Sequence, residues 1–240
     1  MIALTQSLAL WYFTRGSGAL SLVLLTIAFA LGTPTLLNWS SERLPRVVVQ
    51  LLHRNISLLV LMFLFLHVAS TVVDGFAPIG WLDAIVPFRS GYRPIWLGLG
   101  AVAVDLLLAV IITSLLRVRI GYAGWRWVHM LTYAMWPIAL VHGLGTGSDT
   151  RSPWMWWVDG ACSAVVLTCV IVRLRERPAL SPRNRNVAVA ALLIVPVAVA
   201  AWMMVGPMKP DWGKKKRSEG LAPSEATVVD VAAELDAASR

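Results

Sequence analysis

The stretch HRNISLLVLMFLFLH, residues 53–67, places one histidine at each end of an almost wholly apolar run. It belongs to a longer apolar segment, 48–73, which exceeds the about 20 residues that a helix needs to cross roughly 30 Å of hydrocarbon. At 1.5 Å per residue, the 14 positions from His53 to His67 rise about 21 Å, and at 100° per residue they return to within about 40° of the starting direction. This stretch therefore predicts a membrane helix that presents two imidazoles on one face, one in each leaflet.

Five further apolar runs predict an all-α integral membrane protein with six transmembrane helices. Of the 240 residues, 58% are hydrophobic and 14% are charged, which is too apolar for an ordinary soluble domain. The expected spans are 19–37, 48–73, 96–116, 128–144, 158–172 and 187–205. The run that begins near residue 19 is too long for the core of a signal peptide and has no small-residue cleavage site after it, so we expect it to stay in the mature protein.

The six spans divide the chain into three parts. We expect an N-terminal segment, 1–17, a six-helix transmembrane domain, 18–206, and a C-terminal tail, 207–240. From residue 218 onward the tail has no aromatic residue and cannot bury enough apolar surface to fold alone, so we expect the tail to be disordered.

The basic residues predict how the protein sits in the inner (plasma) membrane. The net charge of +8 comes from residues in the connections between spans, which favours a membrane lipid environment and argues against nucleic acid as a partner. Eleven arginines lie on one predicted side of the membrane, and four lie on the other side (Arg15, Arg89, Arg93 and Arg151). The eleven are Arg43, Arg46, Arg54, Arg117, Arg119, Arg126, Arg173, Arg175, Arg177, Arg183 and Arg185. The positive-inside rule puts the side with eleven arginines in the cytoplasm and both termini outside. The basic run 214–217 then follows the last span on the outer side of the membrane. We interpret this run as an anchor to lipid head groups.

All four histidines of the chain fall in the second and fourth spans. His129 and His142 bound the stretch HMLTYAMWPIALVH, and their 13 positions rise about 19.5 Å. Because the second and fourth spans run in the same direction, His53 is expected level with His129 near the cytoplasmic side. His67 is then level with His142 near the outer side, which predicts two stacked bis-histidine sites.

The helical phase puts the two histidines of the second span on one face of the helix, but it does not do so for the two histidines of the fourth span. Thirteen positions leave His129 and His142 roughly 140° apart on an ideal helix. Pro137 lies between them, and a proline can kink or re-phase a membrane helix, so we expect a distortion near Trp136 and Pro137. A straight fourth helix would weaken the pairing.

Paired imidazoles at two depths indicate haem. A neutral ring nitrogen is a strong iron ligand, and two of them fill both axial positions, which suits the transfer of single electrons rather than the direct binding of oxygen. Zinc is a weaker interpretation, because its ligands would have to converge on one centre. The alternative from another class is a non-redox membrane scaffold or transporter, in which the histidines bridge helices or relay protons.

The histidine spacing, together with the segments HRNISLL, FAPIGWLDAIVPF and VHGLGTGSDT, resembles the ferric reductase-like transmembrane domain family. That family includes NADPH oxidases, metalloreductases and the haem subunit of bacterial methionine sulfoxide reductase. The resemblance covers about residues 15–177, looks like an actinobacterial branch, and implies the membrane subunit of an oxidoreductase. It implies two haem b groups, one held by His53 with His129 and the other by His67 with His142.

The chain differs from the oxidases of the family in its expected electron source. It has no GxGxxG motif, and we expect no flavin and nicotinamide domain after the last span. We therefore expect electrons from a separate flavoprotein reductase, which brings its own flavin, or from a quinol, as in a quinol-oxidising respiratory cytochrome. The acceptor lies outside and is ferric iron or a partner protein.

Other polar residues are candidates for supporting roles. Arg54 and Arg126 on the cytoplasmic side, and Arg93 and Arg151 on the outer side, could bind the haem propionates, or they could be interfacial arginines without haem contact. Asp105 stands in the middle of the third span, where a carboxylate is costly. It is a candidate for a proton or quinone contact, or for a structural hydrogen bond to another helix.

Overall fold

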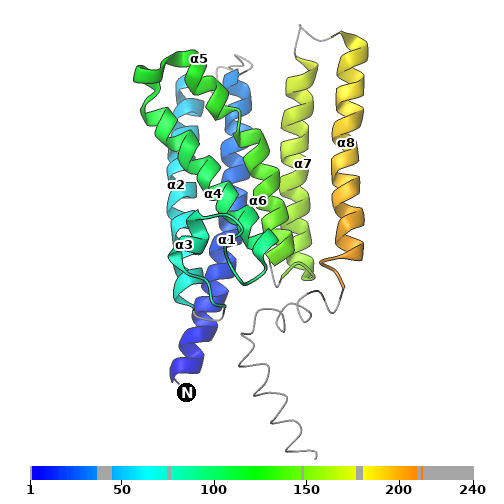
Figure 1. The fold of residues 1–240 in the computed structure, drawn as a ribbon. Helices are drawn as coiled ribbons and strands as arrows, with labels where there is room; N and C mark the ends of the chain where they lie inside the picture. Colours follow the sequence, from blue (N-terminus) through cyan, green and yellow to red (C-terminus); the bar gives the residue numbers. More distant parts are fainter. Residues whose placement is uncertain are drawn as a thin grey trace, which may run out of the picture.

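The structure is a computed structural model in which residues 2–36, 45–74, 77–146, 149–176, 181–209 and 212 are described. Within these ranges every regular element is a helix (Figure 1). The helices are α1 (Ile2–Leu36), α2 (Arg46–Val73), α3 (Trp81–Ile85), α4 (Pro94–Leu115), α5 (Arg117–His129), α6 (Thr132–Thr146), α7 (Pro153–Arg175) and α8 (Pro182–Val205). The predicted tail, 207–240, lies outside the described residues apart from 207–209 and 212, and so does the basic run 214–217.

The long helices run alongside one another in a bundle (Figure 1). The closest packing joins α1 to α2 and α4 to α6, while α7 packs on α1 and α8 packs on α7. The short helix α3 packs on α4, and α5 lies at one end of the bundle. Two helix pairs, α1 with α2 and α4 with α6, therefore carry three of the four histidines, and His129 lies on α5.

Five helices are long and apolar enough to cross a membrane: residues Ala9–Pro34 of α1, and the whole of α2, α4, α7 and α8. This confirms a multi-pass all-α membrane protein. The expected fourth span, 128–144, is not among the five. Its helical core is α6, whose 15 residues rise about 22 Å, less than the roughly 30 Å hydrocarbon thickness. The count of six transmembrane helices is therefore not confirmed.

The distortion expected within the fourth span occurs earlier than predicted. Pro137 lies inside α6, which continues through it, whereas the helix is interrupted at Met130 and Leu131. Four backbone N–H groups around this turn, those of Met130, Leu131, Tyr133 and Ala134, donate to carbonyls three residues back, as in a 3₁₀ helix. Each such residue turns the chain by about 120° rather than 100°, so four of them reduce the 140° offset between His129 and His142 by about 80°.

Helix α1 contributes to both clusters of buried apolar side chains. One cluster joins α1 to α6 and α7 and contains Leu22, Trp136, Leu140, Leu144, Cys162 and Val166. The other joins α1 to α2, α4 and α6 and contains Leu24, Val60, Leu107 and Met135. The indole of Trp136 also donates to the Thr26 hydroxyl at 2.9 Å. The first helix therefore holds together the elements that carry the histidines.

Candidate functional site

One histidine pair consists of His53, near the start of α2, and His129, the last residue of α5. We call it the inner pair, and His67 with His142 the outer pair, after the orientation expected from the sequence. Their ring centroids are 6.2 Å apart, with the ring planes at 67°. Two metal–nitrogen bonds of about 2 Å, together with the half-widths of two imidazoles, require a separation of about 6 Å. The structure thus brings together the two residues that the sequence pairs at this level, at a distance at which both imidazoles could bind one metal ion.

The outer histidine pair faces a cavity. His67 on α2 and His142 on α6 both line a space of about 460 Å³ between α1, α2, α4, α6 and α7. Its volume falls in the roughly 300–1,000 Å³ range of cofactor pockets, and its walls are mostly apolar. The residues present therefore fit a large, mostly apolar group that is bound beside these two imidazoles.

Three of the four imidazoles donate a hydrogen bond from Nδ1 to a backbone carbonyl of a neighbouring helix. His53 donates to Ala28 at 2.9 Å, His67 to Thr14 at 2.9 Å and His142 to Trp96 at 2.8 Å. Because a carbonyl can only accept, Nδ1 carries the proton and Nε2 keeps its lone pair. Metal-binding histidines are commonly oriented in this way, by donation of their other ring nitrogen.

Each of these carbonyls stands four residues before a glycine that lies against the same imidazole. We call this pair of positions a carbonyl–glycine seat; the seats are Thr14 with Gly18, Ala28 with Gly32, and Trp96 with Gly100. A Cβ atom at Gly18 would lie 2.9 Å from the His67 ring, and one at Gly100 would lie 2.5 Å from the His142 ring. At Gly32 a Cβ atom would lie 3.7 Å from the His53 ring, an ordinary contact. The missing side chains let the helix backbone approach the outer rings.

Sequence reasoning missed the seats, although a signal was present. Gly18 and Gly32 are 14 positions apart on the first span, as are His53 and His67 on the second. Because α1 packs along α2, this equal spacing puts one seat at each histidine level.

His129 is held differently from the other three. Its buried Nδ1 has no hydrogen-bond partner within the part of the chain that the structure describes. Its ring instead stacks on the indole of Trp125, with centroids 4.9 Å apart and planes at 30°. The ring lies on α5, outside the five helices that are long and apolar enough to cross a membrane.

The four arginines suggested for propionates differ in position. Arg93 lines the outer cavity, and its guanidinium donates to the carbonyls of Gly145 and Thr146 at 3.0 and 3.2 Å. Arg54, Arg126 and Arg151 are exposed, and none of them lines the outer cavity. Their proposed contacts with a cofactor stay predictions.

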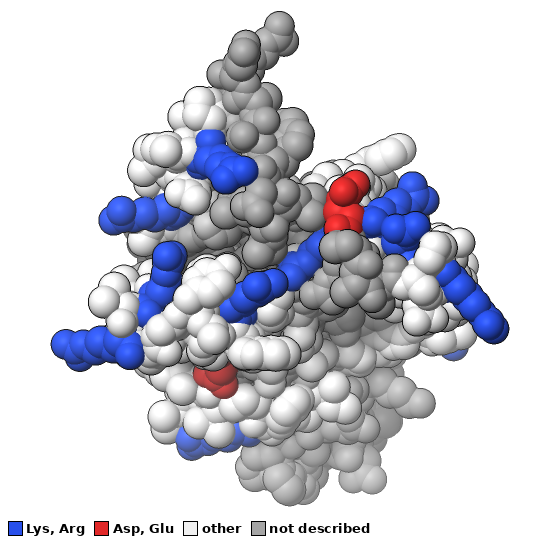
Figure 2. All heavy atoms as spheres, turned by 90° about the horizontal axis from the view of Figure 1, so that it is seen from above, with Lys and Arg blue, Asp and Glu red and all other residues white. Residues whose placement is uncertain are grey.

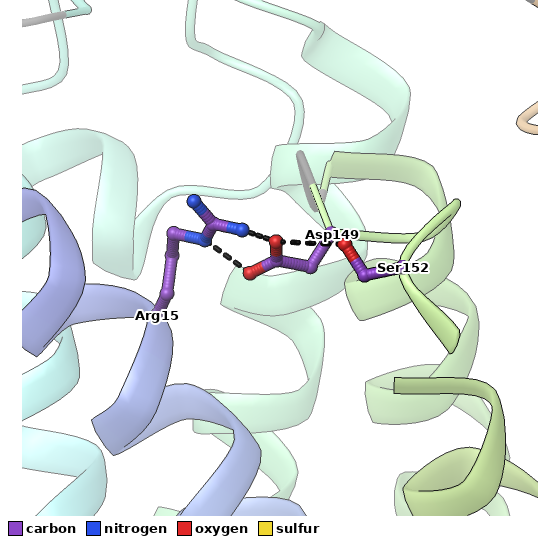
Figure 3. A network of polar contacts seen from close by, with 3 residues as sticks. All are labelled: Arg15, Asp149 and Ser152. Carbon is purple, nitrogen blue, oxygen red and sulfur yellow. Dashed lines mark hydrogen bonds and ion pairs between the residues drawn. The ribbon is translucent and has the colours of Figure 1, made fainter. Parts of the chain in front are cut away.

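A further cation lines the outer cavity. Arg15 on α1 forms an ion pair with Asp149, which also accepts a hydrogen bond from the Ser152 hydroxyl at 3.3 Å (Figure 3). The guanidinium lies 3.7 Å from the centroid of the Trp11 ring. Sequence reasoning treated Arg15 only as an outer-face charge, because nothing local connects it to a residue 134 positions later.

One carboxylate faces this cavity without a visible partner. Asp159 on α7 lines the cavity, and its buried Oδ1 makes no hydrogen bond to any residue described. Asp105, the carboxylate that the sequence suggested, is half-buried on α4 and does not line the cavity. A proton or quinone role for Asp105 stays a prediction.

The fold and the site define a multi-pass helical membrane protein with paired imidazoles at two depths. The model of the family described as ferric reductase like transmembrane component matches residues 15–140, more than half of the chain. The chain therefore belongs to this family, which confirms the resemblance; the actinobacterial branch stays a prediction. The match includes His53, His67 and His129 and ends two positions before His142.

No curated protein and no solved structure shows significant similarity to the chain.

Proposed function

We propose that this chain is a haem b-binding electron-transfer protein that forms the membrane subunit of an oxidoreductase. His53 and His129 would hold the inner haem, and His67 and His142 the outer haem. The observation that carries the proposal is the arrangement of the imidazoles in pairs, three of them with Nδ1 committed to a carbonyl and Nε2 left to bind iron. When bound, the haems supply one-electron redox chemistry at the two depths.

The protein's own residues would orient the haems and balance their charge. The carbonyl–glycine seats fix three ligand rings, and the apolar cavity walls exclude water from the outer site. Arg15 and Arg93 line that cavity and are suited to carboxylate groups such as propionates. For the inner haem, Arg54 and Arg126 remain the candidates.

Electrons would move from the cytoplasmic side to the outer side. Figure 2 looks onto the end of the bundle at which α5 lies and shows many Lys and Arg side chains there. Exposed arginines on this end include Arg117, Arg119 and Arg126 on α5 and Arg175 at the end of α7. By the positive-inside rule, this end faces the cytoplasm, where a flavoprotein or the quinol pool would donate electrons; ferric iron or a partner protein would accept them outside.

Haem content and its dependence on single histidines test the proposal. The purified protein, expressed with added haem, is expected to contain about two haem b groups per chain by pyridine haemochrome spectra. His53→Ala and His142→Ala should each reduce this by one haem. Asn55→Ala, which changes an exposed polar residue two positions after His53, is the control and should keep both haems.

A colourless protein, or histidine variants that lose only thermal stability, would instead support the scaffold or transporter function. Titration of the reduced protein with a quinone distinguishes the two donors, because a quinol-fed site should equilibrate directly with the quinone. A flavoprotein-fed chain should not.

A further inference from the structure

The two ligands of the inner site are not held alike. The His53 ring lies in a carbonyl–glycine seat on α1, whereas His129 is the last residue of α5 and precedes the turn at Met130 and Leu131. Its own carbonyl accepts a hydrogen bond from the Thr132 hydroxyl at 2.8 Å. The backbone of His129 is therefore fixed, but no hydrogen bond from a described residue fixes the orientation of its ring.

The indole of Trp125 lies where such a restraint is needed. It stacks against the His129 ring at 4.9 Å, and its Nε1 donates to the Ser114 hydroxyl, near the end of α4, at 3.1 Å. The Ser114 hydroxyl in turn donates to the Val110 carbonyl at 2.6 Å, so the acceptor has a fixed position. The guanidinium of Arg117 lies 4.9 Å from the centroid of the indole. Trp125 is thereby tied to α4 while its aromatic face covers the imidazole.

We propose that Trp125 is the positioning residue of the inner site: its indole, anchored through Ser114, sets the plane of the His129 imidazole and so the ligand geometry at the inner haem alone. The proposal rests on the function proposed above. A face-to-face contact restricts rotation of the imidazole about its own axis, which a hydrogen bond from Nδ1 does at the other three positions. The outer site, with a seat for each of its rings, does not depend on Trp125.

Two substitutions separate the aromatic face from the rest of the side chain. Trp125→Leu keeps an apolar side chain but removes the aromatic face, whereas Trp125→Phe keeps a smaller aromatic face and removes the Nε1 donor. Trp127→Leu is the matched control, because Trp127 lies on the same helix with 78% of its surface exposed. All are made in the full chain loaded with haem.

Electron paramagnetic resonance of the oxidised protein reports the ligand geometry of each haem. The signal that is missing in His53→Ala belongs to the inner haem. In Trp125→Leu we expect this low-spin signal to shift or to become high-spin, and the inner haem to transfer to apomyoglobin several-fold faster, while the outer signal is unchanged. Trp125→Phe should restore most of both properties, and Trp127→Leu should equal the unmodified protein.

The proposal is overturned if Trp125→Leu leaves the inner signal and the rate of haem transfer unchanged, or if both haem signals change together. It is also overturned if Trp125→Phe behaves like Trp125→Leu, since an aromatic face would then not be sufficient to orient the imidazole. An unmodified protein without haem would contradict the proposed function itself. Two normal haems in both the unmodified protein and Trp125→Leu would contradict only the role of Trp125.

Discussion

Single glycines decide how closely the outer histidines approach the neighbouring helices. A methyl group at Gly100 would stand 2.5 Å from the His142 ring, and one at Gly18 would stand 2.9 Å from the His67 ring. We expect Gly100→Ala and Gly18→Ala to displace these rings and to weaken binding of the outer haem roughly tenfold to a hundredfold, because overpacking costs about 1–3 kcal/mol. The measurement is the rate and extent of haem loss during dialysis against apomyoglobin.

Gly16→Ala is the control for this effect, because no atom lies within 4 Å of a Cβ atom built there. Alanine is a better helix former than glycine by about 1 kcal/mol, so the control should keep both haems and be slightly more stable. Equal haem retention in Gly16→Ala, Gly18→Ala and Gly100→Ala would show that the seats do not require glycine.

At the residue scale, the sequence predicts which side chains form the site better than it predicts the backbone carbonyls and the aromatic ring that hold those side chains in place. The spacing of His53 and His67 follows from helix geometry, because both lie on one uninterrupted helix. The acceptor carbonyls are backbone atoms without a residue signature, and they are identified only once α1 is seen to pack along α2. The stacking of Trp125 on His129 likewise depends on the course of α5, which apolar periodicity does not reveal.

At the element scale, an ion pair joins α1 to the connection between α6 and α7. Arg15 and Asp149 are largely shielded, with side chains 21% and 12% exposed. Asp149→Asn would leave the guanidinium without its anion, and we expect a loss of about 1–3 kcal/mol in the free energy of unfolding. Thermal unfolding of the purified protein in detergent measures this effect.

The charge-swapped double variant, Arg15→Asp with Asp149→Arg, should recover part of that loss. Arg151→Gln, which changes an exposed arginine in the same connection, is the control and should unfold like the unmodified protein. Unchanged unfolding in Asp149→Asn would mean that the pair does not hold the connection to α1.

The elements also show where hydropathy fails as a guide. Hydropathy predicts one span over 128–144, yet the structure divides this run between α5 and α6. Neither Met130 nor Leu131 is a turn-forming residue, and Pro137, the only proline within the run, lies inside α6. Local composition therefore predicts the membrane environment of this segment but not the position of its turn.

At the scale of the whole molecule, the distribution of arginines predicts its orientation. In a chain with Cys162 and Cys169 replaced by alanine, Arg151→Cys should react with a membrane-impermeant maleimide added to intact cells. Ser181→Cys, at the exposed residue directly before α8, should react only after the membrane is permeabilised. This pattern follows from the positive-inside rule, and the reverse pattern would put the basic end outside.

The equal spacing of the seats on α1 and of the histidines on α2 has a consequence for a protein in a bilayer of varying thickness. The two histidine levels are separated by the same number of residues on two adjacent helices, so helix pitch sets their spacing at about 21 Å along the axis. A bilayer that thickens or thins can be accommodated by tilting of the whole bundle, which leaves this spacing unchanged. Under the proposed function, the distance between the two haems would therefore depend on the chain itself and not on the surrounding lipid.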